Sequence, residues 1–359
     1  MVITSYAKTD TTGIEKKVDK LHQKILTIDS HTDTPFELMQ NGFNIAIRHD
    51  PGRNNTKIDF PRMKEGGLDA AFFAVFVSQG KRTPEGNEKV MKRAQILFDT
   101  IHHVVNRNME LAGLALSPRD AYRLKREDRI AVFIGIENGY AIGDDIEMIR
   151  TYFKEGARYI TLCHTRNNDI CDSSTDSTEW NGLSEFGKNV VLFMNKTGMM
   201  VDVSHISDKS FYDVLAISKA PVIASHSCSR AVCNNPRNLD DDMLRALAKN
   251  GGIIQMCILS AYVKAPDSGI ATVKDVVDHI DHIVKVAGID HAGIGTDFDG
   301  GGGVKGCDDV SQMKNITREL VLRGYSDRDI QKIWGGNLMR VMREVTHLSK
   351  KINKACGCS

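Results

Sequence analysis

Short apolar runs alternate with amphipathic stretches along the whole chain. Eight of these runs are rich in Val, Ile, Ala and Phe, and several are almost continuously apolar, which is typical of strands buried on both faces. They predict strands at Leu26–Asp33, Leu68–Val77, Ile130–Gly139, Tyr159–Thr165, Met199–Ile206, Pro221–Cys228, Ile253–Leu259 and Ala292–Gly300.

The stretches between these runs carry apolar residues at helical spacing. They predict helices at Glu88–Asn108, Asp145–Glu155, Ser184–Lys196, Ser207–Ser218, Asp240–Lys249, Thr272–Ala287, Asp308–Leu322, Asp327–Trp334 and Asn337–Val345, with Ser207 or Asp208 suited to cap the fourth. Repeated strand–helix units give a parallel sheet, and eight units favour a closed (β/α)8 TIM barrel over an open doubly wound sheet. We therefore expect one α/β catalytic domain over residues 1–359, with its core at about 26–345 and short extensions at both ends.

Composition narrows the functional classes. Net charge is +1, so no overall positive charge favours nucleic acid or a membrane surface as partner. No apolar run reaches the roughly 20 residues that span a bilayer, and neither a signal-peptide core nor a hydrophobic anchor tail is recognisable. We expect a soluble protein, cytoplasmic as written, with an exported precursor left open. Eight cysteines in a long chain do not indicate a disulfide scaffold, and Cys356 and Cys358 are expected in a loose tail.

Side chains of the kinds that bind metals stand at the carboxyl ends of the predicted strands. A closed parallel barrel brings all these ends to one rim, so residues far apart in sequence share one cavity. We therefore predict a hydrolytic metal centre formed by His31, Asp33, Glu137, His205, His226 and Asp297.

A separate chemical argument supports each of the following residues as a metal ligand. His31 and Asp33 are two residues apart on a strand, so both side chains reach the same ion. Glu137 ends a buried apolar run, where a carboxylate is costly unless it is paired or bound to a metal, and its two oxygens suit it to bridge two cations. His205 and His226 end neighbouring strands, and neutral imidazole is a good ligand for zinc.

Two further polar positions near the rim are assigned by role. Asp297 is the better candidate for acid/base chemistry, with Asp299 second on the same strand face. His164 is a candidate ligand, but the other side chains suffice for two ions, so we expect it to face the substrate. Loops 41–60 and 167–181 are expected over the rim, and Gly300–Gly303 is interpreted as a flexible turn.

At these residues the chain resembles the membrane (renal) dipeptidase family, a zinc-dependent part of the amidohydrolase-like group. The resemblance runs from about Leu26 to Val345. It includes IDSHTDTP, IDFPRMKEGGLDAAFFAVFV, GIENG, YITLCHTRNN, GLSEFG, VDVSHIS, PVIASHSCSRAVCNNPRNLDD, GIGTDFDG and IWGGNLMRV.

The resemblance implies a binuclear zinc dipeptidase on a (β/α)8 barrel. The tail for a lipid anchor is missing from this sequence, as in bacterial relatives. His31, Asp33 and Glu137 hold one Zn²⁺, and Glu137, His205 and His226 hold the other, with Glu137 and a water or hydroxide as bridges. It further implies dipeptide substrates, including some with a C-terminal D-residue, and a homodimer. His164 meets the scissile carbonyl, Arg237 binds the substrate carboxylate, Asp297 binds the amine and moves protons, and Tyr262 lines the pocket. The chain departs from many relatives at Asn138 and Tyr140, where they carry Gly and His.

Two other functions stay open at this point. A related metallohydrolase acting on a cyclic amide, a lactone or an aminated ring would use the same fold and ligands, because fold alone does not fix the substrate. A barrel that keeps the ligands without catalysis is the other alternative. Arg237 favours dipeptides over the first, and the complete ligand set disfavours the second.

Overall fold

The computed structural model describes residues 11–50 and 56–357. Within them, one sheet contains all named strands, and every pairing is parallel. The strands are β1 (Ile28–Thr32), β2 (Ala70–Phe76), β3 (Ala112–Leu114), β4 (Ile130–Glu137), β5 (Ala157–Thr161), β6 (Met200–Asp202), β7 (Ile223–Ser227), β8 (Ile253–Met256) and β9 (Ala292–Ile294). They pair in the order β1-β2-β4-β5-β6-β7-β8-β9, and β3 pairs with the start of β4.

The two ends of this series meet and close a barrel. The Asp297 N–H donates to the His31 carbonyl at 3.0 Å, and the Asp33 N–H donates to the Phe298 carbonyl at 2.8 Å. These bonds join the end of β1 to the segment that follows β9. The predicted α/β barrel with eight parallel strands is therefore confirmed, and β3 is an additional strand outside the ring.

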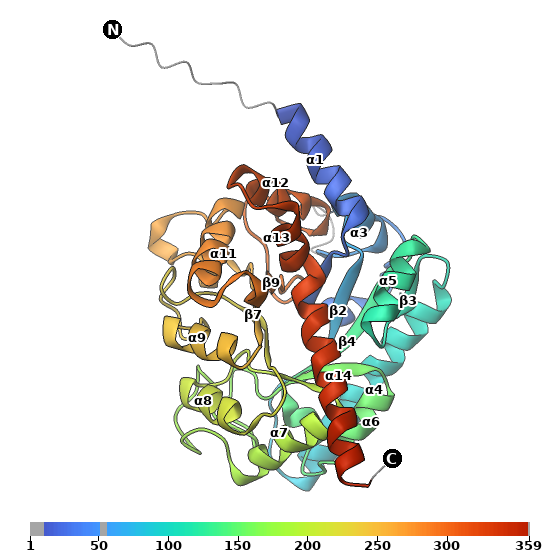
Figure 1. The fold of residues 1–359 in the computed structure, drawn as a ribbon. Helices are drawn as coiled ribbons and strands as arrows, with labels where there is room; N and C mark the ends of the chain where they lie inside the picture. The colour runs from blue at the N-terminus through green and yellow to red at the C-terminus, as the bar shows by residue number, and fades with distance from the viewer. Residues whose placement is uncertain (1–10, 51–55, 358–359) are drawn as a thin grey trace.

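Helices surround the strands (Figure 1). They are α1 (Thr11–Lys24), α2 (Thr34–Leu38), α3 (Phe60–Gly66), α4 (Pro84–Arg107), α5 (Pro118–Arg126), α6 (Met148–Lys154), α7 (Glu185–Thr197), α8 (Asp208–Ile217), α9 (Asp241–Lys249), α10 (Ser260–Val263), α11 (Val273–Ala287), α12 (Lys314–Leu322), α13 (Asp327–Gln331) and α14 (Asn337–Ala355). Ser207 caps α8, as predicted, because its side chain accepts a hydrogen bond from the Ser210 N–H. No helix in the described ranges is long and apolar enough to cross a membrane.

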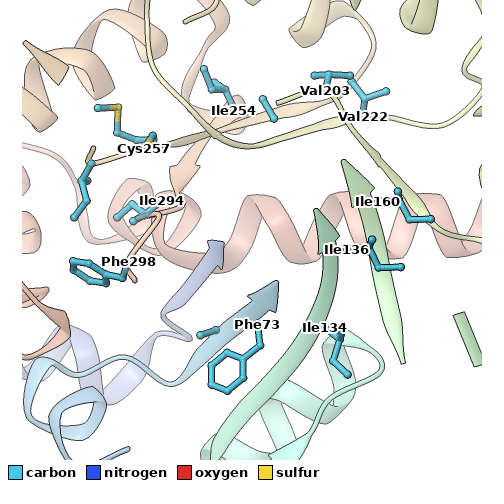
Figure 2. Packing of buried hydrophobic residues seen from close by; sticks show 14 of the residues in the cluster. Phe73, Ile134, Ile136, Ile160, Val203, Val222, Ile254, Cys257, Ile294 and Phe298 are labelled. Atoms are coloured by element: carbon cyan, nitrogen blue, oxygen red, sulfur yellow. The ribbon is translucent and has the colours of Figure 1, made fainter. Parts of the chain in front are cut away.

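Alternation along each strand separates two apolar layers. Phe73, Ile134 and Ile254 belong to the larger cluster, which packs between the strands and the outer helices (Figure 2). Their neighbours Phe72 and Phe133 belong to a second cluster inside the barrel. Successive side chains of a strand point to opposite faces, so this separation follows directly from the continuous apolar runs in the sequence.

The long C-terminal helix α14 closes the end of the barrel opposite the predicted rim. Its side chains Leu338, Met339, Met342 and Val345 belong to the interior cluster, and the helix runs across the strands in Figure 1. Apolar packing thus fills the amino-terminal part of the barrel interior. Polar groups are left for the carboxyl ends of the strands.

Candidate metal centre

The predicted ligands converge at the carboxyl ends of the strands. Oε1 of Glu137 lies 3.0 Å from Nε2 of His205 and 3.5 Å from Nε2 of His226. Oε2 of the same carboxylate lies 3.5 Å from Nε2 of His31. The two oxygens of Glu137 therefore face different imidazoles, which is the geometry that a bridging carboxylate requires.

Two further carboxylates complete the cluster on the His31 side. Nε2 of His31 lies 4.0 Å from Oδ2 of Asp33 and 4.0 Å from Oδ1 of Asp297. All three side chains are buried. Three overlapping sets of side chains offer ligand atoms within 4.8 Å of one another: His31, Glu137 and His226; Glu137, His164 and His205; and His31, Asp33 and Asp297.

Hydrogen bonds beneath the cluster fix the tautomers of two histidines. Nδ1 of His226 lies 2.8 Å from Oγ of Ser225, whose hydroxyl donates to Asp202 at 2.6 Å. Ser225 must then accept from the Nδ1–H of His226, which leaves the Nε2 lone pair facing the cluster. Nδ1 of His31 lies 2.8 Å from the Tyr159 hydroxyl, and an Nδ1–H donated to this oxygen orients His31 in the same way.

The arrangement of donors fits divalent cations. Nε2 of His31 and Oδ1 of Asp33 are buried and have no hydrogen-bond partner among the described residues. Nε2 of His205 lies 2.8 Å from Nε2 of His226, so the lone pair of at least one of these two ring nitrogens faces the other nitrogen. Buried polar atoms are rarely left without partners, so unsatisfied lone pairs that converge on the same space indicate a site for a positive ion.

Electrostatics supports this reading. Burial, together with Glu137 and Asp297, raises the pKa of Asp33 well above its usual value. Burial opposes a proton on His31, but the charges of Glu137, Asp33 and Asp297 outweigh it and raise the His31 pKa to about 10. The buried carboxylates thus need a positive partner, which is a proton when no cation is present.

The backbone takes unusual conformations where it presents two of these side chains. His205 has φ of 71° and Asp297 has φ of 62°, in the left-handed region that costs energy for residues other than glycine. Both were expected on strands, but β6 ends at Asp202 and β9 ends at Ile294. Turns, not strand pleats, therefore aim these side chains into the cluster.

One expectation for the segment after β9 is wrong. Asp299 does not share a strand face with Asp297: its carboxylate accepts bonds from the Lys57 N–H at 2.6 Å and the Thr34 hydroxyl at 2.8 Å. The predicted turn at Gly300 is present, and a Cβ at this position would lie 2.0 Å from Oδ2 of Asp33 and 2.4 Å from Oδ1 of Asp297. The glycine lets the backbone pack directly against both carboxylates.

The remaining predicted residues lie around the cluster. Nε2 of His164 is 3.8 Å from Oε1 of Glu137, and burial lowers the His164 pKa, so this imidazole is neutral near pH 7. Arg237 is buried, donates to the His226 carbonyl at 3.1 Å and lies 5.3 Å from the ring centre of Tyr262. It makes no ion pair with a carboxylate of the described chain.

Sequence reasoning missed the groups that support the ligands. Tyr159 and Asp202 lie on β5 and β6 and are fully buried. Asp202 also accepts from the Thr161 hydroxyl at 2.5 Å and from the Ser225 N–H at 2.8 Å. A carboxylate inside the apolar run of β6 is a detectable signal, because a buried charge needs partners; Tyr159 looks like an ordinary strand aromatic.

The membrane dipeptidase family, peptidase family M19, matches residues 15–355. The chain belongs to this family. Dipeptidase ataJ of Aspergillus terreus is 36% identical over 357 residues, covering 92% of this chain and 87% of that protein. Dipeptidase 3 of Rattus norvegicus is 33% identical over 333 residues, covering 90% of this chain and 66% of that protein.

Solved structures agree with the family assignment. A crystal structure described as the probable dipeptidase PvdM of Pseudomonas aeruginosa superimposes with a TM-score of 0.88 at 30% identity, covering 94% of this chain and 100% of that chain. The M19 protein is thus a dipeptidase, a peptide-bond hydrolase of a metallopeptidase family, and its cluster of His, Glu and Asp side chains is the candidate metal site.

Proposed function

We propose that this M19 dipeptidase uses two zinc ions. In this proposal His31, Asp33 and Glu137 hold one ion, and Glu137, His205 and His226 hold the other. The main observation in its favour is that the two carboxylate oxygens of Glu137 face different histidines. Oε1 lies 3.0 Å from Nε2 of His205, and Oε2 lies 3.5 Å from Nε2 of His31. When bound, the pair of ions polarises the scissile carbonyl and lowers the pKa of a water molecule toward about 7.

Arg237 is proposed to bind the C-terminal carboxylate of the dipeptide. A buried guanidinium without a carboxylate partner among the described residues is costly, and a substrate carboxylate would satisfy it. Its Nε has no hydrogen-bond partner in the described chain, so donors are available for a forked pair. Tyr262, whose ring lies 5.3 Å from the guanidinium carbon, lines the same part of the pocket.

Asp297 is proposed to bind the substrate amine and to move protons. Its carboxylate stands 4.0 Å from Nε2 of His31, whereas Arg237 donates to the carbonyl of His226. Burial raises its pKa well above the usual value, so this carboxylate accepts a proton readily and returns it to the leaving nitrogen. Substrate length is then set by two charged anchors, Arg237 and Asp297.

His164 is proposed to stabilise the oxygen of the attacked carbonyl. A neutral imidazole donates one N–H, and its low pKa keeps it in that form. The proposal extends to dipeptides with a C-terminal D-residue, as the family resemblance implies.

A hydrolysis screen tests the proposed function. Purified protein is assayed with L-Ala-L-Ala, L-Ala-D-Ala and a panel of lactones and cyclic amides, before and after a chelator, and after zinc is restored. We expect dipeptide hydrolysis that the chelator abolishes and zinc restores, with about two zinc ions per chain by elemental analysis. Full activity in demonstrably metal-free protein, or hydrolysis of the cyclic compounds alone, contradicts the proposal.

A further inference from the structure

A pocket of about 800 Å³ lies beside the candidate metal centre, and none of its lining residues has a role in the proposed mechanism. We call it the side pocket. Phe36, Phe76 and Tyr140 form its apolar walls, and Lys81, Lys89 and Arg93 supply positive charge. It is much larger than needed for the alanine side chain of a simple test dipeptide.

The side pocket adjoins the reacting groups. Phe36 and Tyr140 each follow a predicted ligand by three residues, Asp33 and Glu137 respectively. Phe76 is the last residue of β2, and its ring meets the His164 ring edge-on at a centroid distance of 4.7 Å. Its ring also lies 5.5 Å from that of Phe36. Phe76 is therefore the wall that the side pocket shares with the catalytic centre.

The walls of the side pocket are aromatic, and their one hydroxyl, on Tyr140, is already hydrogen-bonded. Phe36 and Phe76 are only half-buried, so part of each ring faces open space. The Tyr140 hydroxyl donates to the Lys81 carbonyl at 2.6 Å, which fixes the ring in place. Such a surface gains free energy when it covers an apolar or aromatic group.

The charge of the side pocket is unbalanced. Among its lining residues, Glu85 is the one carboxylate, against the three cations Lys81, Lys89 and Arg93. None of these cations makes an ion pair within the described residues. The Arg93 guanidinium carbon instead lies 5.9 Å from the centre of the Phe36 ring, so its charge sits at the edge of the aromatic wall.

We propose that the side pocket receives the side chain of the substrate's N-terminal residue, and that it favours an aromatic body ending in an acidic group. This inference depends on the proposed function, in which Asp297 binds the amine and Arg237 binds the carboxylate. Asp297 and Asp33 share one group of ligand atoms within 4.8 Å, and Phe36, a wall of the side pocket, follows Asp33 on α2. The N-terminal residue thus lies on the side of the pocket, and the C-terminal residue lies beside His226.

Two dipeptides of equal shape isolate the effect of charge. L-4-carboxyphenylalanyl-L-alanine carries the acid, and L-4-carbamoylphenylalanyl-L-alanine replaces it with a neutral amide. We expect kcat/KM to be about three- to tenfold higher for the acid, since partly exposed ion pairs each contribute modestly. The preference should shrink as salt rises from about 0.05 to 0.5 M.

Variants connect the preference to the pocket. The double variant Lys89→Gln/Arg93→Gln should bring the two rates within about twofold of each other, because the acid loses the positive charge that favours it. Lys92→Gln is the matched control, because Lys92 is on the same helix but does not line the pocket and pairs with Glu88. It should keep the full preference.

Each failure has a distinct signature. Equal rates for acid and amide in the wild type, or a preference that survives the double variant, would overturn the side-pocket proposal while hydrolysis persists. Absence of zinc-dependent hydrolysis of every dipeptide, L-Ala-L-Ala included, would instead overturn the proposed function on which it depends.

Discussion

The hydroxyl of Tyr159 offers a direct test of how the barrel interior supports the metal centre. It lies 2.8 Å from Nδ1 of His31, and both side chains are fully buried. Replacing Tyr159 with Phe leaves the ring but removes the oxygen that accepts the His31 Nδ1–H. That tautomer, with the Nε2 lone pair free, is the one that binds a cation.

The magnitude follows from the unsatisfied group. A buried N–H without a partner costs about 1–3 kcal/mol, so Tyr159→Phe penalises the metal-bound state by that amount. The metal-free protein can avoid the penalty by releasing the Nδ1 proton and keeping the proton on Nε2, where Oε2 of Glu137 lies 3.5 Å away, whereas a cation at Nε2 requires the proton on Nδ1. We therefore expect zinc to bind about 10- to 100-fold more weakly at the His31 side, with kcat/KM lowered at limiting zinc and partly restored at high zinc.

The assay is competition for zinc between the metal-free protein and a chromophoric chelator. Tyr152→Phe is the control, because Tyr152 is also fully buried and its hydroxyl donates to the Ala141 carbonyl at 2.8 Å without touching a predicted ligand. It should lose stability and keep its zinc affinity. If Tyr159→Phe binds zinc as tightly as the wild type, the tautomer argument is wrong.

Three other changes have defined outcomes. Arg237→Ala should lower kcat/KM for a free dipeptide by about 100-fold and leave the C-terminal amide of the same dipeptide nearly unaffected; equal losses for both would refute the carboxylate role. Gly135→Ala would put a Cβ 2.1 Å from Cζ of Tyr159. We therefore expect the free energy of unfolding to fall by about 1–3 kcal/mol, measured by chemical unfolding, and zinc to bind more weakly in the same competition assay. Unchanged zinc affinity would contradict this prediction. Burial lowers the pKa of His22 from 6.5 to about 4. Between these pH values the unfolded chain therefore binds one proton more than the folded chain. The free energy of unfolding of the metal-free protein should fall by about 3 kcal/mol as the pH drops through this window. His22→Gln should remove that part of the pH dependence, and identical slopes for the two proteins would refute it.

The eight barrel strands were predictable because each lies in a largely apolar run. Continuous burial on both faces leaves a strong signal, and parallel closure then implies that the ends meet. The apolar pattern does not predict the backbone conformations that orient the ligand side chains. His205 and Asp297 adopt left-handed conformations, which alternation in the sequence cannot reveal for residues that are not glycine.

Helix α14 shows a different limit. Apolar spacing predicts its start at Asn337 but not its end, because polar residues dominate beyond Val345. The helix continues to Ala355. Its last turns are held by tertiary hydrogen bonds, since the Ser349 hydroxyl and the Asn353 amide both donate to the Lys196 carbonyl, at 2.7 and 3.0 Å. Contacts between distant segments decide such boundaries.

The interior of the barrel and the metal centre form one packing unit. Alternation along β4 puts Phe133, Gly135 and Glu137 on the same face. Because Gly135 has no side chain, the Tyr159 ring packs against its backbone and extends beneath the cluster to His31. A volume change at Gly135 is therefore expected to alter the tautomer of His31, so in the proposed zinc enzyme the first glycine of GIENG is constrained by metal binding as well as by packing.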